Sequence, residues 1–170
     1  TQYKTLINQM NEALAEVNTK EEIVFVNNRF TKLLGYSLDE IYKKPVTKFL
    51  TTKSKEVFLK KKKKKKMGYL KRYELTWKSK DGNIIHTLIS PTILYDKKGN
   101  QRGSFALMTD ISQLKKTQTK LREERELLQI TLKKIREGVI VTDNKGKVVL
   151  MNRSAEEITE WKYKFAFSKP

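Results

Sequence analysis

An internal repeat is the feature that most constrains how this 170-residue chain can fold. When residues 12–36 are shifted by 125 positions, EALAEVNTKEEIVFVNNRFTKLLGY aligns without gaps with EGVIVTDNKGKVVLMNRSAEEITEW. Four positions are identical, Asn27 and Asn152 among them, and the apolar strands, the polar turn and the aromatic end coincide. Such a repeat indicates two copies of a domain of roughly 100 residues. Because the second copy lacks the later part of the first, we expect residues 137–170 to be poorly ordered or repacked.

The first copy begins with alternating short helices and strands. Residues 4–17 are expected to form a short amphipathic helix that runs into a strand, and the apolar segment IVFV at 23–26 forms the next strand. A further helical stretch is expected over residues 52–66. These segments place several short helices between the second and third strands.

The predicted helices carry recognisable end signals. Asn27 and Asn152 stand at equivalent strand-to-helix junctions, where an asparagine side chain commonly caps the helix. Gly35 is expected to end the helix that follows Asn27. Ser37 and Glu40 have the spacing of a capping box for the next short helix.

A three-stranded meander follows. YLKRYELTWKS at 69–79 alternates in the manner of a strand, and an Asp-Gly pair at 81–82 is a strong hairpin turn. Residues 84–95 form the return strand, in which Pro91 predicts a bulge, and residues 104–111 form the last strand. The order of elements predicts an α+β fold with one antiparallel sheet.

The hydrophobic period changes to that of a helix at the end of this meander. Polar Gln118 and Arg125 occupy two a positions of a heptad repeat, which weakens a coiled coil but fixes its register. Every d position carries leucine or isoleucine: Leu114, Leu121, Leu128 and Ile135. We predict a short parallel dimeric coiled coil over residues 112–135, and the alternative is a surface helix packed on its own domain.

Three segments together resemble the PAS domain family of sensory modules. They are IVFVNNRFTKLLGYSLDEI at 23–41, GYLKRYELTWKSKDGNII at 68–85 and ALMTDIS at 106–112, the last similar to the family's Asp-Ile-Thr ending. The resemblance implies a five-stranded antiparallel sheet of order 2-1-5-4-3. Short helices on one face of this sheet then form a pocket, and a coiled-coil helix follows.

The resemblance also implies a division of the chain and a role for it. Residues 1–111 are expected to be a PAS-like sensor domain with a short N-terminal helix, 112–135 a coiled-coil signalling helix, and 136–170 the truncated start of a second PAS-like domain. Such modules bind small molecules or cofactors, form homodimers and pass signals through the outgoing helix. The expected parent is a two-component sensor histidine kinase, or a cyclase, whose output domain is absent from this chain.

The candidate site residues fall into two groups. Asp110 and Ser112 match the family's signal-coupling position, where the carboxylate can pair with a basic residue and the hydroxyl can cap the outgoing helix. The candidates for contact with a small ligand or cofactor are Phe30, Leu34, Tyr36, Tyr73, Leu75, Trp77, Leu88 and Phe105. The alternative is that these apolar and aromatic side chains only fill the core.

Cofactor expectations follow from which ligating residues are present. Haem-binding relatives supply an axial histidine from the helix before the third strand, but residues 52–66 contain none, and His86 lies on a strand. We therefore do not expect haem. The absence of cysteine excludes a cysteinyl-flavin adduct and any disulfide. A non-covalent flavin or a small organic ligand remains open, and no metal site is expected.

Seven consecutive lysines, Lys60–Lys66, contribute to a net charge of +18. They surround two helical turns, so they cannot all face one partner, and no base-reading helix or aromatic ladder accompanies them. We favour a solvated flank of the predicted helix over a nucleic-acid contact. The alternative function is a basic adaptor that binds nucleic acid or anionic membrane through this run.

No catalytic motif is found in the sequence. It lacks a P-loop, a glycine-rich nucleotide loop, a histidine–carboxylate cluster and a nucleophile paired with a base, so we expect no enzymatic activity from this chain. No apolar run approaches the roughly 20 residues that a membrane-spanning helix needs, and no signal-peptide pattern is present. We expect a cytoplasmic protein.

Overall fold

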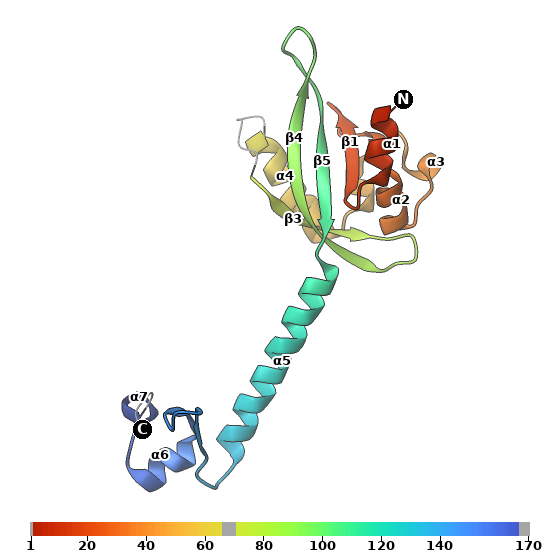
Figure 1. Cartoon of the computed structure of the whole chain (residues 1–170). Helices are drawn as coiled ribbons and strands as arrows, with labels where there is room; N and C mark the ends of the chain where they lie inside the picture. The colour runs from red at the N-terminus through yellow and green to blue at the C-terminus, as the bar shows by residue number, and fades with distance from the viewer. Residues whose placement is uncertain (1, 66–70, 167–170) are drawn as a thin grey trace. The chain divides into compact units, whose positions relative to one another are not determined.

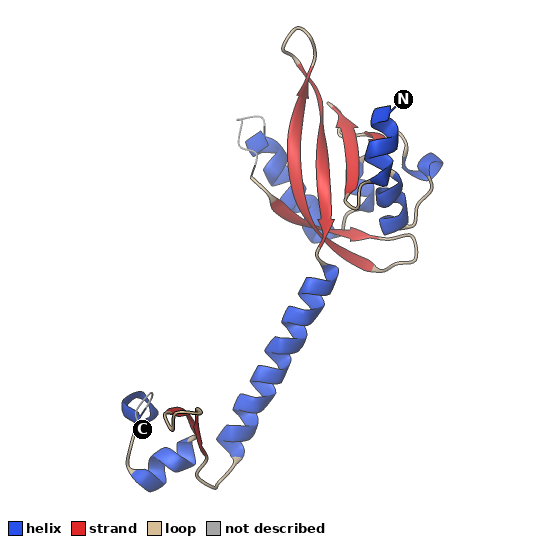
Figure 2. Ribbon diagram, viewed as in Figure 1, coloured by secondary structure: helices blue, strands red, loops and turns tan. Residues whose placement is uncertain are grey.

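The computed structural model describes residues 2–65 and 71–166, with side chains for residues 5–61 and 71–166 (Figures 1 and 2). The chain forms two compact units, residues 1–115 and 116–170. The first unit contains a five-stranded sheet, and the second contains a two-stranded one.

The five-stranded sheet is antiparallel throughout, in the spatial order β2-β1-β5-β4-β3. Its strands are β1 (Ala13–Asn18), β2 (Ile23–Val26), β3 (Tyr73–Lys78), β4 (Ile84–Tyr95) and β5 (Gln101–Asp110). The first and last strands of the unit therefore pair at the centre of the sheet. This order is the one that the family resemblance implied, and it confirms the α+β fold class.

Short helices between β2 and β3 pack on one face of the sheet. The helical elements of the unit are α1 (Gln2–Gln9), α2 (Asn28–Leu34), α3 (Leu38–Ile41), the 3-10 turn η1 (Val46–Phe49) and α4 (Thr52–Lys65). Their apolar residues and the inward residues of the strands form one buried core. Phe30 of α2 meets Trp77 of β3 edge-to-face, with ring centroids 5.8 Å apart, a geometry that aromatic pairs favour.

The predicted helix end signals are confirmed. The side chain of Asn27 caps α2, and Gly35 ends that helix in the left-handed region with φ of 76°. The backbone N–H of Ser37 donates to the carboxylate of Glu40 at 2.9 Å, as a capping box requires. Glu40 also accepts from Lys80 Nζ at 2.7 Å. This contact links α3 to the turn after β3, and together with the bond from Ser37 it lowers the pKa of Glu40 to about 2.

The bulge predicted at Pro91 is wrong. Pro91 stays in register opposite Ala106, and the irregularity between β4 and β5 falls between Leu94 and Tyr95 instead. On its other side, β4 pairs with β3 only as far as Ile89. Pro91 therefore lies beyond the end of the β3 ladder, where its missing N–H removes no bond to that strand.

Helix α5 (Ser112–Lys134) follows β5 directly, and none of its residues is buried. The helix expected over residues 112–135 is confirmed, whereas its pairing with a second chain stays a prediction. The d-position side chains Leu114, Leu121 and Leu128 are 54%, 65% and 54% exposed. The helix thus presents an apolar row that nothing in the chain covers among the residues that the structure describes.

The second unit repeats the start of the first, element by element. It contains β6 (Ile140–Thr142), β7 (Val148–Met151), α6 (Arg153–Thr159) and α7 (Tyr163–Ala166). The pairs Ile140↔Met151 and Val141↔Leu150, and the bulge that follows them, are those of the β1–β2 pair shifted by 125 residues. Where they are described, residues 137–170 therefore keep the local arrangement of the first copy and are not repacked, whereas poor order there stays a prediction.

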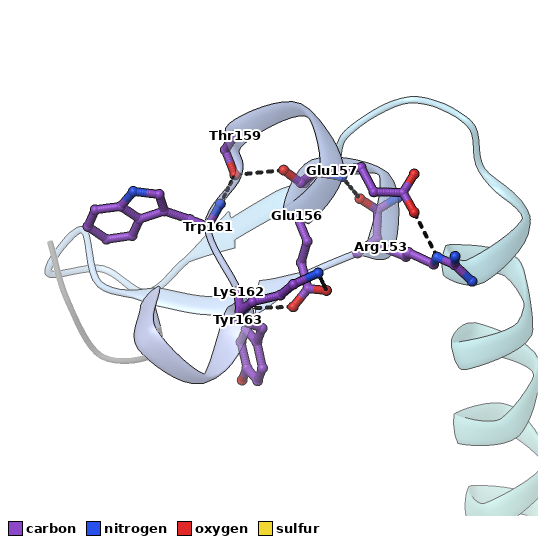
Figure 3. Close-up of polar contacts among 9 residues, drawn as sticks. Arg153, Glu156, Glu157, Thr159, Trp161, Lys162 and Tyr163 are labelled. Atoms are coloured by element: carbon purple, nitrogen blue, oxygen red, sulfur yellow. Dashed lines mark hydrogen bonds and ion pairs between the residues drawn. The ribbon is translucent and has the colours of Figure 1, made fainter.

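Polar contacts stabilise this short unit from within (Figure 3). Arg153 pairs with Glu157 at 2.8 Å along α6, and Glu156 accepts from the backbone N–H of Tyr163 at 2.7 Å, which links α6 to α7. Apolar side chains remain uncovered, with Ile158 70% and Trp161 55% exposed.

Candidate functional site

A cavity of about 60 Å³ lies between α4 and the inner face of the sheet. Phe58 and Lys61 of α4 form one wall, and Glu21, from the turn between β1 and β2, also lines it. The other lining residues are Ala15, Val17, Val46, Lys71, Tyr73, Leu75, Trp77, Ile89, Pro91, Ser104, Phe105, Ala106 and Met108. The sequence positions these walls because β1, β3, β4 and β5 each turn alternate side chains toward the helices.

The polar groups beside the cavity already have partners. Trp77 Nε1 donates to Thr87 Oγ1 at 2.7 Å, and that hydroxyl donates to the carbonyl of Leu75 at 3.3 Å. Among the described residues, no buried side-chain nitrogen or oxygen lacks a hydrogen-bond partner. The lining of the cavity is therefore mainly apolar, and its buried polar groups are hydrogen-bonded.

Two charged residues of the lining, Lys61 and Glu21, lie near Tyr73. Lys61 Nζ lies 5.5 Å from the centroid of the Tyr73 ring, a distance at which a cation is attracted to the ring face. Burial raises the pKa of the Tyr73 hydroxyl to about 12, and the negative charge of Glu21 adds to the shift. The hydroxyl therefore remains protonated at neutral pH and can donate a hydrogen bond.

The predicted ligand contacts divide into three groups in the structure. Tyr73, Leu75, Trp77 and Phe105 line the cavity. Phe30 and Leu34 are fully buried in the adjoining core, and half-buried Tyr36 packs against it. Leu88 pairs with Glu74 and Thr109 and, because side chains alternate along a strand, lies on the face opposite buried Thr87 and Ile89. A ligand contact by any of the eight stays a prediction.

Sequence reasoning did not select the charged residues of the cavity. Lys61 was treated only as part of the lysine run, and Lys71 and Glu21 were not considered. Their signal in the sequence was position: Lys71 immediately precedes β3, and Glu21 lies in the polar turn before β2. The rest of the run beyond Lys61 has no described side chains, so the prediction of a solvated flank lies outside the described residues there.

The start of α5 is held to the sheet by a set of contacts that we call the exit latch: Glu74, His86, Asp110, Ile111, Ser112 and Lys115. The backbone N–H of His86 donates to Ser112 Oγ at 3.0 Å, and its carbonyl accepts from Ile111 at 2.9 Å. Lys115 Nζ lies 2.8 Å from a carboxylate oxygen of Glu74 on β3. The first turn of the outgoing helix is thus bonded to β3 and β4.

Within the latch, Asp110 and Ser112 form other hydrogen bonds than the ones expected of them. The Asp110 carboxylate accepts from the backbone N–H of Ser112 at 2.8 Å, so it supplies the acceptor for the start of the helix. The Ser112 hydroxyl, which was expected to cap the helix, accepts from His86 instead. Their signal-coupling role stays a prediction.

Asn27 joins three elements of the first unit through its side-chain amide. Its Oδ1 accepts from Leu14 and Phe30 at 2.9 and 3.1 Å, and its Nδ2 donates to the carbonyls of Ile7 and Glu12 at 3.1 and 2.9 Å. This clamp, fully buried, ties the end of α1, the start of β1 and the start of α2 together.

Asn152 forms the same clamp in the second unit. Its Oδ1 accepts from Val139 and Ala155 at 2.8 and 2.9 Å, and its Nδ2 donates to Leu132 and Glu137 at 3.3 and 2.9 Å. Every partner is the first-unit partner shifted by 125 residues. The carbonyl of Leu132 belongs to α5, so the last two turns of α5 occupy the place that α1 has in the first unit.

The cavity does not fit the larger cofactors. Sites for drug-sized ligands typically span about 300–1,000 Å³, so neither haem nor a flavin fits a cavity of about 60 Å³. His86 is not among its lining residues. Within the described ranges, no three His, Cys, Asp or Glu side chains gather in a metal-binding group. A search of the same residues finds no helix that is both long and apolar enough to span a membrane.

Sequence comparisons identify related proteins over both units. A family model described as PAS domain matches residues 11–113, and one described as PAS fold matches residues 125–170. Sporulation kinase A of Bacillus subtilis (strain 168) is 30% identical over an alignment of 165 positions, which covers 93% of this chain and 26% of that protein. The chain therefore spans about a quarter of the length of this relative.

Structural comparisons find the same fold. A PAS domain from a two-component sensor histidine kinase superposes with a TM-score of 0.56 at 17% identity, covering 64% of this chain and 93% of that one. The PAS domain of a protein from Colwellia psychrerythraea gives a TM-score of 0.61 at 18% identity, covering 66% and 96%. At these identities the likeness concerns the fold alone.

Proposed function

The chain belongs to the PAS domain family, and from this premise we propose that it senses a small ligand in the core cavity and relays that state through α5 to an output domain. Its coarse role is that of a sensory module in signal transduction. Sporulation kinase A, to which the chain is similar, is a kinase, and the output that we propose is a histidine kinase. The chain itself takes no catalytic part in this proposal.

The exit latch is the single observation that carries the relay. Ser112 and Ile111 bond to His86 on β4, and Lys115 pairs with Glu74 on β3. Because β3 and β4 also wall the cavity, a shift of either strand on ligand binding changes the contacts of the first turn of α5. A helix anchored to both strands converts such a shift into rotation or a change of register.

The Asn152 clamp is the proposed receiving end of the relay. It bonds the end of α5 to the residues just before β6 and to α6, as Asn27 bonds α1 in the first unit. A rotation of α5 therefore acts on the start of the second domain through the carbonyl of Leu132. We assign the domain parts accordingly: a sensor (1–111), a signalling helix (112–135) and the start of a second PAS-like domain (136–170).

Homodimerisation through α5 and the PAS domain completes the proposal. The exposed row of Leu114, Leu121 and Leu128 recurs every seven residues, which suits a parallel coiled coil. A pair of such helices transmits rotation, whereas a single solvated helix of 23 residues bends and frays.

Native mass spectrometry of the purified chain tests the dimer. We expect a dimer, and Leu121→Lys, at a d position, converts it to monomer because two facing lysines repel in an apolar seam. Ile130→Lys is the matched control, since Ile130 is 51% exposed and lies outside the a and d positions. A monomeric wild-type chain, or equal loss of dimer in both variants, contradicts the coiled coil.

A further inference from the structure

We propose that the core cavity takes the apolar end of a short monocarboxylate and that Lys61 and Lys71 hold its carboxylate at the rim. This inference rests on the proposed sensory function, because it names the class of signal for the same cavity. Three features of the cavity support it: the chemistry of its interior, its size and the charge at its rim.

The interior of the cavity disfavours a polar group on the part of the ligand that enters it. The wall is mainly aliphatic and aromatic, and the buried polar pair beside it, Trp77 and Thr87, is already hydrogen-bonded. A polar group inserted between these aliphatic and aromatic side chains loses its bound water. Only an apolar group enters without that penalty.

The size of the cavity limits the ligand to a few carbon atoms. A water molecule occupies about 30 Å³ of liquid, so a cavity of about 60 Å³ admits a group of roughly two to four carbons. Propionate, butyrate and isobutyrate have apolar ends of this size. Longer chains require α4 to move away from the sheet.

The described charged residues of the lining include more lysine than glutamate. Lys61 and Lys71 both line the cavity, and neither has an ion pair with a described carboxylate. Among the described residues of the lining, Lys61 and Lys71 are cationic and Glu21 is anionic. Tyr73, protonated at neutral pH, adds a hydroxyl donor beside Lys61. Ammonium and hydroxyl donors of this kind bind a carboxylate.

The lysine run gains a role from this arrangement. Lys61 belongs to the seven-lysine run, so part of that run faces a cavity and not only solvent. The net charge of +18 favours the approach of anions over cations at low ionic strength. The class of ligand that we infer is therefore anionic at its exposed end and apolar at its buried end.

Titration calorimetry and fluorescence of the full chain test the proposal. Trp161→Phe removes the exposed indole of the second unit, so that Trp77, which lines the cavity, becomes the reporter. The probes are sodium propionate, butyrate and isobutyrate. Butanol and butylamine, which lack the carboxylate, are the controls. Valine, which adds an ammonium group to the isobutyrate skeleton, tests whether Glu21 binds a cation. We expect saturable binding of the carboxylates in the millimolar range, as suits ligands of ~5–6 non-hydrogen atoms.

Charge variants locate the carboxylate. Lys61→Gln and Lys71→Gln each weaken butyrate binding about two- to fivefold, as exposed ion pairs do, and the double variant weakens it about tenfold. Lys97→Gln, in the exposed turn between β4 and β5, is the matched control and leaves the affinity unchanged. If valine binds more tightly than isobutyrate, the ammonium group of valine contacts Glu21 while its carboxylate contacts the lysines.

Three outcomes overturn the inference. The first is that butanol or butylamine binds as tightly as butyrate, and the second is that the lysine variants bind butyrate as tightly as the wild type. The third is that none of the carboxylates binds at concentrations up to about 50 mM, 50-fold above the expected dissociation constant of ~1 mM. The oligomeric state is measured on the same samples. An intact dimer without carboxylate binding removes only the ligand class, whereas carboxylate binding to a monomeric chain removes the dimeric relay and leaves the ligand class standing.

Discussion

The two copies of the repeat have the same local hydrogen bonds and different burial. Asn27 and Asn152 make equivalent sets of four bonds, yet the first copy encloses an aromatic core and the second leaves Ile158 and Trp161 exposed. The reason is non-local: β1 pairs with β5 on one side and with β2 on the other, whereas the described partner of β6 is β7. A stretch of about 30 residues sets a clamp and a hairpin, but burial requires strands from far along the chain.

Phe30→Ala is expected to have the largest effect on the stability of the first copy. It places in the first copy the alanine that the second copy has at the equivalent position, Ala155. Phe30 is fully buried against Trp77, so we expect the first unit to lose about 3–5 kcal/mol of unfolding free energy. Urea unfolding followed by Trp77 fluorescence in a Trp161→Phe background measures it. A loss below about 1 kcal/mol contradicts the assigned core.

The clamps themselves are tested by Asn27→Ala and Asn152→Ala. Removing the fully buried Asn27 side chain takes a hydrogen-bond partner from backbone groups at α1, β1 and α2, so we expect a loss of about 2–4 kcal/mol in the first unit. Asn152→Ala leaves that unit unchanged and speeds amide exchange in α6 and at the end of α5. Asn28→Ala, at an exposed neighbouring position, is the control. Equal effects of both substitutions on the first unit contradict the division into two units.

Asp110→Ala tests the junction between β5 and α5. The Asp110 carboxylate satisfies a backbone N–H at the start of the helix, and losing such an acceptor costs about 1 kcal/mol. We expect that decrease in urea unfolding and faster exchange over the first turn of α5. Unchanged stability and exchange indicate that the latch is redundant.

The smallest effect concerns Glu40, whose contact with Lys80 has no counterpart in the second copy, since Phe165 occupies the equivalent position. Its pKa falls from the ordinary 4.5 to about 2, so the pair stabilises the fold above pH 4.5, and this contribution is lost as the pH falls toward 2. Side-chain carbon chemical shifts of Glu40 across this range measure its titration. In Glu40→Gln, we expect the unfolding free energy of the first unit to fall less steeply between pH 4.5 and 2 than in the wild type.

Much of the fold was predictable because its signals are local. The strand IVFV, the cap at Asn27, the stop at Gly35 and the helix from Ser112 each depend on a few neighbouring residues, and all are confirmed. The prediction of a bulge at Pro91 was wrong. Whether β4 has a partner strand on that side of Pro91 depends on where β3 begins, and no residue near Pro91 encodes the start of β3.

The candidate site was less predictable. Aromatic alternation identified Tyr73, Leu75 and Trp77 as residues of the inner face, and all three line the cavity. The same reasoning could not find Lys61, because its place at the rim follows from how α4 packs on the sheet. Nor could it extend the repeat to α5, where Leu132 takes the place of Ile7 through backbone carbonyls that carry no side-chain signature.

Hydrogen exchange along α5 in Ser112→Ala tests the central claim, that this helix relays the state of the sensor to the second domain. The substitution removes the bond to His86 at the exit latch, and Thr119→Ala, an exposed hydroxyl on the same helix, is the control. The proposal predicts faster exchange in Ser112→Ala both at the start of α5 and at residues 132–137 beside the Asn152 clamp. Exchange that changes only at the start of α5, with residues 132–137 unaltered, contradicts the relay.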